Sequence, residues 1–180
     1  QGNLYSKAIT RWEHVDLGNN RNFVKATRTV EFMYDGNSTH KDRAFSYIYN
    51  DTNGNLTQKI EWGEVTGDDE GAFTDNGTDK FTTDISYAAS STLPIFTLPS
   101  QETAIDQSLN KVKETKFYYD NLTFGSIKYG NETKREFWKT ATSYIDTEKS
   151  FNSFGLITQE KDPRDKITAF TYDRENLFVT

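Results

Sequence analysis

The 180-residue sequence contains no cysteine, two histidines, three prolines and one methionine. Without cysteine, the chain can form neither disulfides nor thiolate metal sites. His14 and His40 have no candidate ligands at metal-binding spacing, so we interpret them as surface or turn residues. No G-x-S-x-G nucleophile motif occurs either. We therefore expect no catalytic residues, no metal ligands and no cofactor.

Long apolar runs and positive charge are also lacking. No run of about 18 apolar residues occurs, which predicts that the chain does not span a membrane. The net charge is −6 and the isoelectric point is about 5.0, so the phosphate backbone of a nucleic acid would be repelled. The first four residues show neither the basic nor the apolar part of a signal peptide. These features exclude nucleic acid as an expected partner.

Aromatic residues are plentiful although other apolar residues are few. Hydrophobic residues make up only 34% of the chain, but aromatic residues account for 14%, which is unlike a disordered segment. They occur beside Thr and Val, which favour strands. No amphipathic helix with caps at both ends can be found. The composition therefore predicts a folded, polar, all-β protein.

Five stretches place apolar or aromatic side chains at every second position, which is the periodicity of a β-strand. Their alternating residues are Val30, Phe32 and Tyr34; Phe45, Tyr47 and Tyr49; Thr83, Ile85 and Tyr87; Thr115, Phe117 and Tyr119; and Thr168, Phe170 and Tyr172. We expect Phe32, Tyr47, Phe117 and Phe170 to occupy equivalent positions on one face of stacked hairpins.

An aromatic residue followed by Asp or Asn ends most of these stretches and recurs elsewhere. Side chains of Asp and Asn can accept hydrogen bonds from backbone N–H groups that follow them, which ends a strand and begins a turn. Gly54, Gly130 and Gly155 follow such pairs and permit a positive φ. The pairs are Tyr34-Asp35, Tyr49-Asn50, Tyr119-Asp120, Phe151-Asn152 and Tyr172-Asp173.

Two segments interrupt this pattern. Residues 63–79 are acidic and rich in glycine, which predicts an exposed acidic loop or an irregular hairpin. Residues 90–100 carry two of the three prolines, so we expect an extended crossing segment there instead of a central strand. Neither segment has the composition of a long linker. We therefore interpret residues 1–180 as one continuous section.

Residues 151–173 combine Phe151-Asn152, Gly155, Asp162-Pro163 and Tyr172-Asp173. This order resembles the YD repeat of Rhs proteins, and looser copies lie around Tyr49-Asn50 and Tyr119-Asp120. Within that superfamily, the chain is most similar to the B and C components of bacterial Tc insecticidal toxins. The resemblance covers most of residues 28–180. It departs from the family pattern at Asp165, where the family usually has glycine, and Asp tolerates left-handed geometry better than most residues.

The resemblance implies antiparallel β-hairpin repeats that form part of a large, curved or spiralling shell. In that case the chain is a non-catalytic fragment of a longer, secreted or cell-surface bacterial toxin, and the shell encapsulates a C-terminal toxin domain. Its partners would be other YD repeats of the same parent chain, the encapsulated toxin polypeptide and other toxin-complex subunits. Any enzymatic activity would lie in the separate C-terminal domain.

Other interpretations remain open from the residues alone. A cell-surface adhesin or carbohydrate-binding β-domain would use exposed aromatic residues such as Trp12, Trp62 and Trp138. Glu61 and Glu64 could form the carboxylate pair of a glycosidase, although we expect a strand end to direct them to different faces. Oxygen ligands in residues 51–55 and 68–79 could bind Ca²⁺, but neither segment follows the EF-hand order.

Overall fold

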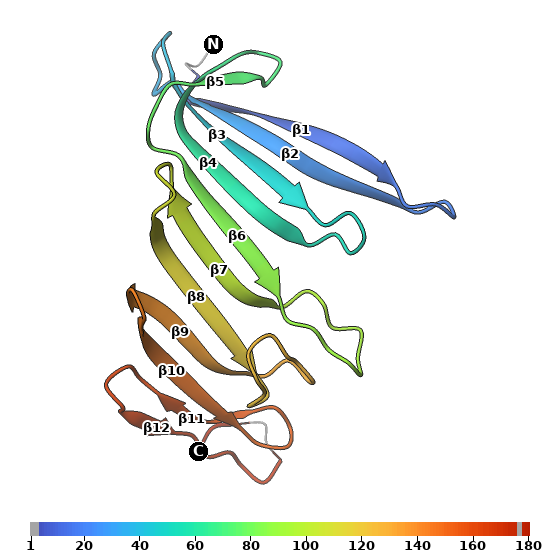
Figure 1. Ribbon diagram of the computed structural model, residues 1–180, viewed down its shortest axis with the longest axis vertical. Coiled ribbons are helices and arrows are strands. Elements are labelled where there is room, and N and C mark those ends of the chain that lie inside the picture. The colour runs from blue at the N-terminus through green and yellow to red at the C-terminus, as the bar shows by residue number, and fades with distance from the viewer. Residues whose placement is uncertain (1–3, 176–177) are drawn as a thin grey trace. The chain divides into compact units, whose positions relative to one another are not determined.

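The computed structural model describes residues 4–175 and 178–180 of the chain and confirms the all-β prediction (Figure 1). The described residues form twelve strands and contain no helix, so none that could cross a membrane. The strands are β1 (Ser6–Asp16), β2 (Asn22–Met33), β3 (Lys41–Tyr49), β4 (Leu56–Gly67), β5 (Phe73–Asp75), β6 (Phe81–Tyr87), β7 (Pro99–Asp106), β8 (Lys111–Tyr119), β9 (Glu132–Thr140), β10 (Ser143–Phe151), β11 (Ile157–Lys161) and β12 (Ile167–Ala169).

The strands form one open antiparallel sheet in which neighbours in sequence are almost always neighbours in the sheet. The hydrogen-bonded order runs from β1 to β4, continues with β6 and ends at β12, while β5 pairs with β4 alone. Short turns therefore connect most strands as hairpins. Contacts divide the chain into two compact units, residues 1–85 with 103–112 and residues 86–102 with 113–180.

The first unit has a small apolar cluster on β2, β3 and β4. Val30, Phe32, Ala44 and Val65 are its buried members. They meet because Val30 lies opposite Ala44, and Phe32 lies opposite Asp42, which is opposite Val65. This cluster is small for the length of chain that it serves, so much of the stability must come from the pairing of strands.

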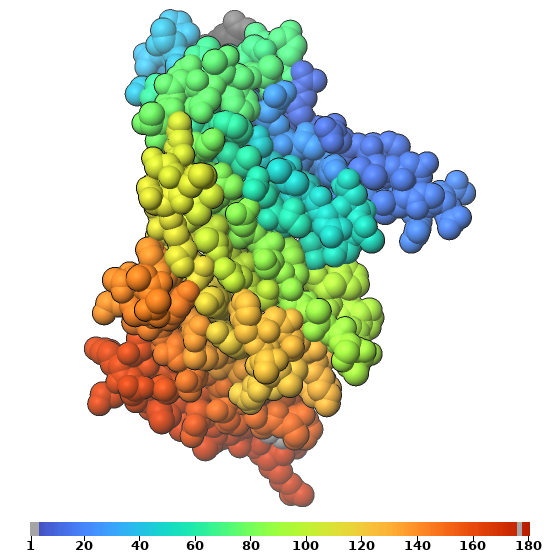
Figure 2. Space-filling view, viewed as in Figure 1, coloured from blue at the N-terminus to red at the C-terminus, as the bar shows by residue number. Residues whose placement is uncertain are grey.

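The second unit has its own small cluster, formed by the ends of strands and two loops. Ala88, Tyr119 and Ile127 are buried there, and Phe117 packs against them. Residues 88–98 and 120–131 are the two loops, and a short parallel bridge between Ala89 and Ser126 joins them. Their surfaces adjoin in lime and gold in Figure 2. The loops therefore complete the cluster that the strands begin.

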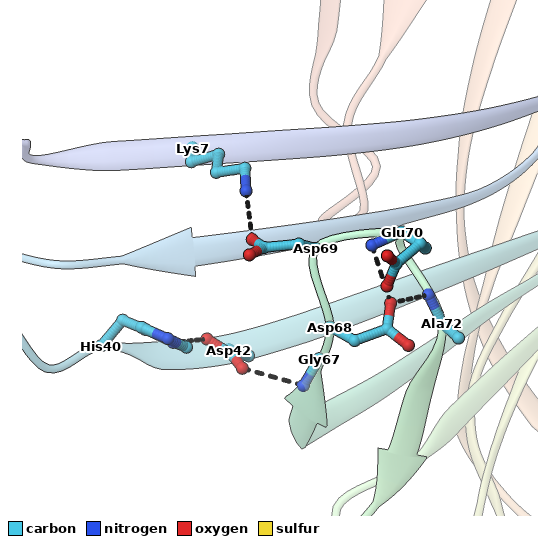
Figure 3. Close-up of polar contacts among 8 residues, drawn as sticks. All are labelled: Lys7, His40, Asp42, Gly67, Asp68, Asp69, Glu70 and Ala72. Atoms are coloured by element: carbon cyan, nitrogen blue, oxygen red, sulfur yellow. Dashed lines mark hydrogen bonds and ion pairs between the residues drawn. The ribbon is translucent and has the colours of Figure 1, made fainter.

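A hairpin formed by β4 and β5 covers the cluster of the first unit. Figure 3 shows its tip, where Asp69 lies 2.5 Å from the Lys7 ammonium of β1. Gly71 packs closely there, because a Cβ atom at this position would lie 2.7 Å from Ile9. Buried Asp42 accepts the Gly67 N–H at 2.9 Å and also bonds to His40. These contacts hold the hairpin against the sheet.

Phe32 of β2 and Tyr47 of β3 do not share a face, so their expected alignment is wrong. Phe32 lies opposite Asp42, and the β3 side chains on that face are the even-numbered ones, because strand side chains alternate. Tyr47 therefore lies on the other face. The turn between the two strands sets this register, and both faces of the first unit carry aromatic residues as a consequence.

The two segments that interrupt the sequence pattern are partly regular. Residues 63–79 contain the end of β4, a turn and β5, which pairs with β4 from Val65 to Gly67. Residues 90–98 belong to no strand, and β7 begins at Pro99. A proline fits at a first strand position because it removes no hydrogen bond from the interior of the ladder.

Candidate functional site

One five-residue turn recurs at four hairpins, and it is the feature that the sequence repeats. In each copy, the N–H of the first residue donates to the carbonyl of the fifth at 2.9 Å, and the N–H of the fourth donates to the carbonyl of the first at 3.0 Å. The first residue is always Asp or Asn. The copies are residues 68–72, 106–110, 152–156 and 162–166.

The first side chain of each turn closes it with a further bond. Its Oδ1 atom accepts the N–H of the fifth residue at 2.7 to 3.0 Å in all four copies. Backbone N–H groups of Lys166 and Arg164 lower the pKa of Asp162. The side chain and the N–H of Asn110 lower the pKa of Asp106. Bonds to the charged form favour that form, so both carboxylates prefer to be ionised in the folded chain.

The fourth residue of every copy has left-handed geometry. Its φ is 76° at Gly71, 64° at Leu109, 79° at Gly155 and 60° at Asp165. Glycine adopts this conformation without strain, and Asp adopts it more easily than most residues. Asp165 therefore preserves the turn, as expected. Pro163 occupies the second position, where the turn uses no N–H group.

Asp120 closes a longer loop with the same chemistry. Its carboxylate accepts the N–H groups of Lys128 at 2.9 Å, Tyr129 at 2.8 Å, Gly130 at 3.0 Å and Asn131 at 3.0 Å. Partial burial by itself would raise the pKa of Asp120, but these four N–H groups lower it. A single carboxylate thus binds the last four backbone N–H groups of the loop between β8 and β9.

The tyrosines that precede Asp120 and Asp173 anchor each turn to a neighbouring strand. The Tyr119 hydroxyl donates to the carbonyl of Pro99 at 2.8 Å, and the Tyr172 hydroxyl donates to that of Ile157 at 2.8 Å. Pro99 and Ile157 are the first residues of β7 and β11. Burial, together with the charge of Glu132, raises the pKa of Tyr119 to about 12. Two Tyr-Asp pairs therefore make the same contact in different hairpins.

Two of the other pairs follow the turn chemistry. Asn50 accepts the N–H groups of Thr52 and Asn53, and Gly54 has a φ of 78°. Asn152 is the first residue of one of the four recurring turns, and Phe151 directly precedes it. Beside Asp173, whose Oδ1 atom accepts the Phe178 N–H at 3.3 Å, the chain turns again.

Tyr34-Asp35 is different from the other pairs. The Asp35 N–H donates to the carbonyl of Tyr5 at 3.2 Å, and the φ of Asp35 is 50°. The Tyr34 ring packs against His40, with 4.7 Å between ring centroids. This pair therefore joins a strand end to β1 through the backbone, and its aromatic ring belongs to the cluster of the first unit.

Sequence reasoning did not connect two of the four recurring turns with the others. Asp68 and Asp106 follow strands without an aromatic residue before them, and Leu109 stands where glycine marks other copies. The signal that could have found them is an Asp or Asn directly after each period-2 run. The hydroxyl contacts to Pro99 and Ile157 had no local signal, because their partners are about 15 to 20 residues away.

The candidate carboxylate pair has a different geometry from the expected one. Glu61 lies opposite Phe45 and Glu64 lies opposite Arg43, because β4 has an extra residue between them. Phe45 and Arg43 are both odd-numbered positions of β3, so Glu61 and Glu64 share a face and the expectation of opposite faces is wrong. Glu61 lies 2.7 Å from the ammonium of Lys59.

Several of the acidic residues that could bind Ca²⁺ have protein partners. Asp68 accepts backbone N–H groups, Asp69 pairs with Lys7, and Asp51 pairs with Lys25. Within residues 4–175 and 178–180, no group of three or more His, Asp or Glu residues could hold a metal ion.

The fold and these turns define the chain as an antiparallel hairpin protein whose turns are closed by Asp and Asn side chains. Comparison with models of known protein families and with curated protein sequences finds no match.

Proposed function

We propose that the chain is a non-catalytic wall segment of a bacterial Rhs or Tc-like toxin, whose sheet encloses a C-terminal toxin polypeptide. The observation that carries this proposal is the turn that recurs after β4, β7, β10 and β11 with matching bond lengths. A turn repeated in this way supports hairpins that are added one after another in a single sheet.

The energetics of the fold support the same proposal. The two apolar clusters contain only seven buried hydrophobic residues in total, four in the first and three in the second. Hairpins with so little core gain stability from neighbouring hairpins instead of from a central interior. A wall has two surfaces and a thin interior, so it fits a chain with 27% charged residues.

Two measurements test this function. Sequencing of the coding region around this segment is expected to show further aromatic–Asp/Asn pairs and a terminal region of different composition. In the purified full-length product, that terminal region should resist protease until denaturant opens the sheet. A reading frame without further pairs, or a terminal region cleaved as fast as the same polypeptide alone, would contradict the proposal.

A carbohydrate-binding domain is the second candidate, because Trp12 exposes 64% of its surface on β1. Arg11, Glu13, Arg28 and Ser46 lie around it, and an exposed indole beside polar groups can stack on a sugar ring. For this candidate we expect calorimetry to show that a neutral oligosaccharide binds to the chain, and we expect Trp12→Ala to abolish this binding. If calorimetry detects no heat of binding with a broad panel of oligosaccharides, the carbohydrate-binding candidate is rejected and the wall segment is the only one of the two that remains.

A further inference from the structure

Three turns at one end of the strands of the second unit expose apolar side chains. Leu93, Leu122, Phe124 and Phe154 are 44%, 40%, 43% and 72% exposed, and we call these four residues the apolar loop tips. They lie in segments 88–98, 121–127 and 152–156, which contain no charged residue. Charged residues make up 27% of the chain, so three uncharged segments with exposed apolar side chains are unexpected at a surface that faces only water.

The three segments lie close together. The N–H of Ala89 donates to the carbonyl of Gly125 at 2.8 Å, which joins the first two segments. A pocket of about 340 Å³ lies between the second and third, lined by residues that include Leu122, Tyr129 and Asn152. Figure 1 shows all three turns at the same end of their strands. The apolar loop tips therefore belong to one surface.

Much of the backbone of the β8–β9 loop and of the turn at residues 152–156 is hydrogen-bonded to protein atoms. Eight of the eleven N–H groups in residues 121–131 donate to protein atoms, four of them to Asp120. Four of the five N–H groups in residues 152–156 do so as well. A loop can leave water at low cost only when its polar backbone groups already have partners.

The charges beside the tips favour a lipid surface. The carboxylate of Asp120 is turned inward to four N–H groups, and Lys128 places its ammonium 4.7 Å from the centroid of the exposed Tyr129 ring. Aromatic rings and lysines are the side chains that occupy the headgroup region of a bilayer. Lys128 is an exposed cation on a chain of net charge −6, so it gives anionic lipids a local point of attraction at this end.

We propose that the apolar loop tips insert into the interface of a lipid bilayer, with Lys128 and Tyr129 at the headgroups. The tips stand on separate turns with Thr, Ser and Asn between them. Separate tips suit a fluid bilayer, which closes around each one, better than a rigid protein surface, which requires a continuous complementary patch.

Flotation with vesicles tests this proposal. The full chain should float with phosphatidylcholine vesicles, and more strongly when phosphatidylglycerol is added. Leu122→Asp/Phe154→Asp should weaken vesicle binding about 100-fold, since two large apolar side chains no longer enter the interface. Lys128→Ala should remove only the increment that phosphatidylglycerol adds, and high salt should do the same.

Leu109→Asp is the matched control, because it also replaces an exposed leucine in a turn. Leu109 occupies the left-handed position that Asp165 occupies in another copy, so this variant should fold and float as the unmodified chain does. Circular dichroism and melting temperature check each variant, and Leu93→Asp replaces the double variant if that one unfolds. Failure of the unmodified chain to float overturns the proposal. So does self-association in light scattering that the double variant abolishes, because the tips would then be a protein contact.

Discussion

Asp120→Ala should destabilise the loop between β8 and β9 by about 3 kcal/mol. A hydrogen bond to a charged group contributes about 1.5–3 kcal/mol net, and less where water can readily take its place. Lys128 and Tyr129 are exposed, so water can replace the carboxylate at their N–H groups, while Gly130 and Asn131 are half-buried and lose more. Amide hydrogen exchange of residues 128–131, followed by NMR, measures this loop directly. A loss of about 3 kcal/mol corresponds to exchange that is about 100-fold faster.

Asp120→Asn is the control for charge. Asn fits the φ of 56° at this position, but one of its two side-chain groups is a donor and cannot accept an N–H group. We expect a loss of about 1–2 kcal/mol. The pKa of Asp120 is below its ordinary value of 3.8, so its stabilisation is complete above that pH and disappears as the pH falls through the folded-state pKa. The difference between the two proteins should therefore vanish in acid.

Equal exchange rates in Asp120→Ala and in the unmodified chain would refute this reasoning. That result would mean that loop contacts such as Ala89 with Ser126 hold residues 128–131 in place without the carboxylate.

Two further predictions follow from local geometry and from burial. Gly63→Ala should cost more than about 3 kcal/mol in urea unfolding, because its φ is 68° and a Cβ atom would lie 2.1 Å from the carboxylate of Asp79. Gly18→Ala, at a φ of 74° with no atom within 4 Å of the added Cβ, should cost only about 1 kcal/mol, and equal losses would contradict the role of Asp79. Burial raises the pKa of Tyr118 and of Tyr119 to about 12 from 10.0, with help from Glu136 and Glu132 respectively. Since the fold favours the neutral form, the stabilisation from these two tyrosines should be fully present below pH 10.0. The free energy of unfolding should then fall as the pH rises toward about 12. This fall should become smaller in Tyr119→Phe.

The strands and their turns could be predicted because their causes are local. Alternation such as Phe45, Tyr47 and Tyr49 requires only that one strand has two faces, and an Asn or Asp after the strand is enough to begin a turn. Leu109 shows where this reasoning fails. Its turn has the same bonds as the glycine turns, so the left-handed residue is imposed by the surrounding hairpin and not by its own preference.

Register across strands could not be predicted in the same way. Phe32 and Tyr47 would share a face if Phe32 were paired with an odd-numbered residue of β3, but its partner is Asp42. An extra residue in β4 likewise brought Glu61 and Glu64 to one face. Such insertions leave no mark in a single sequence, because one more residue in a strand alters no local preference.

The β4–β5 hairpin covers one side of the first unit, so the two sides differ in the surface that they could present to an enclosed polypeptide. One side is already occupied by the chain's own hairpin, which packs Phe73 against Trp62. The other side presents the Phe45 ring, with Arg43 and Lys59 stacked over it. Both cations are already paired, Arg43 with Glu31 and Lys59 with Glu61, so a polypeptide that meets this second side would find an aromatic ring bordered by ion pairs whose charges are balanced.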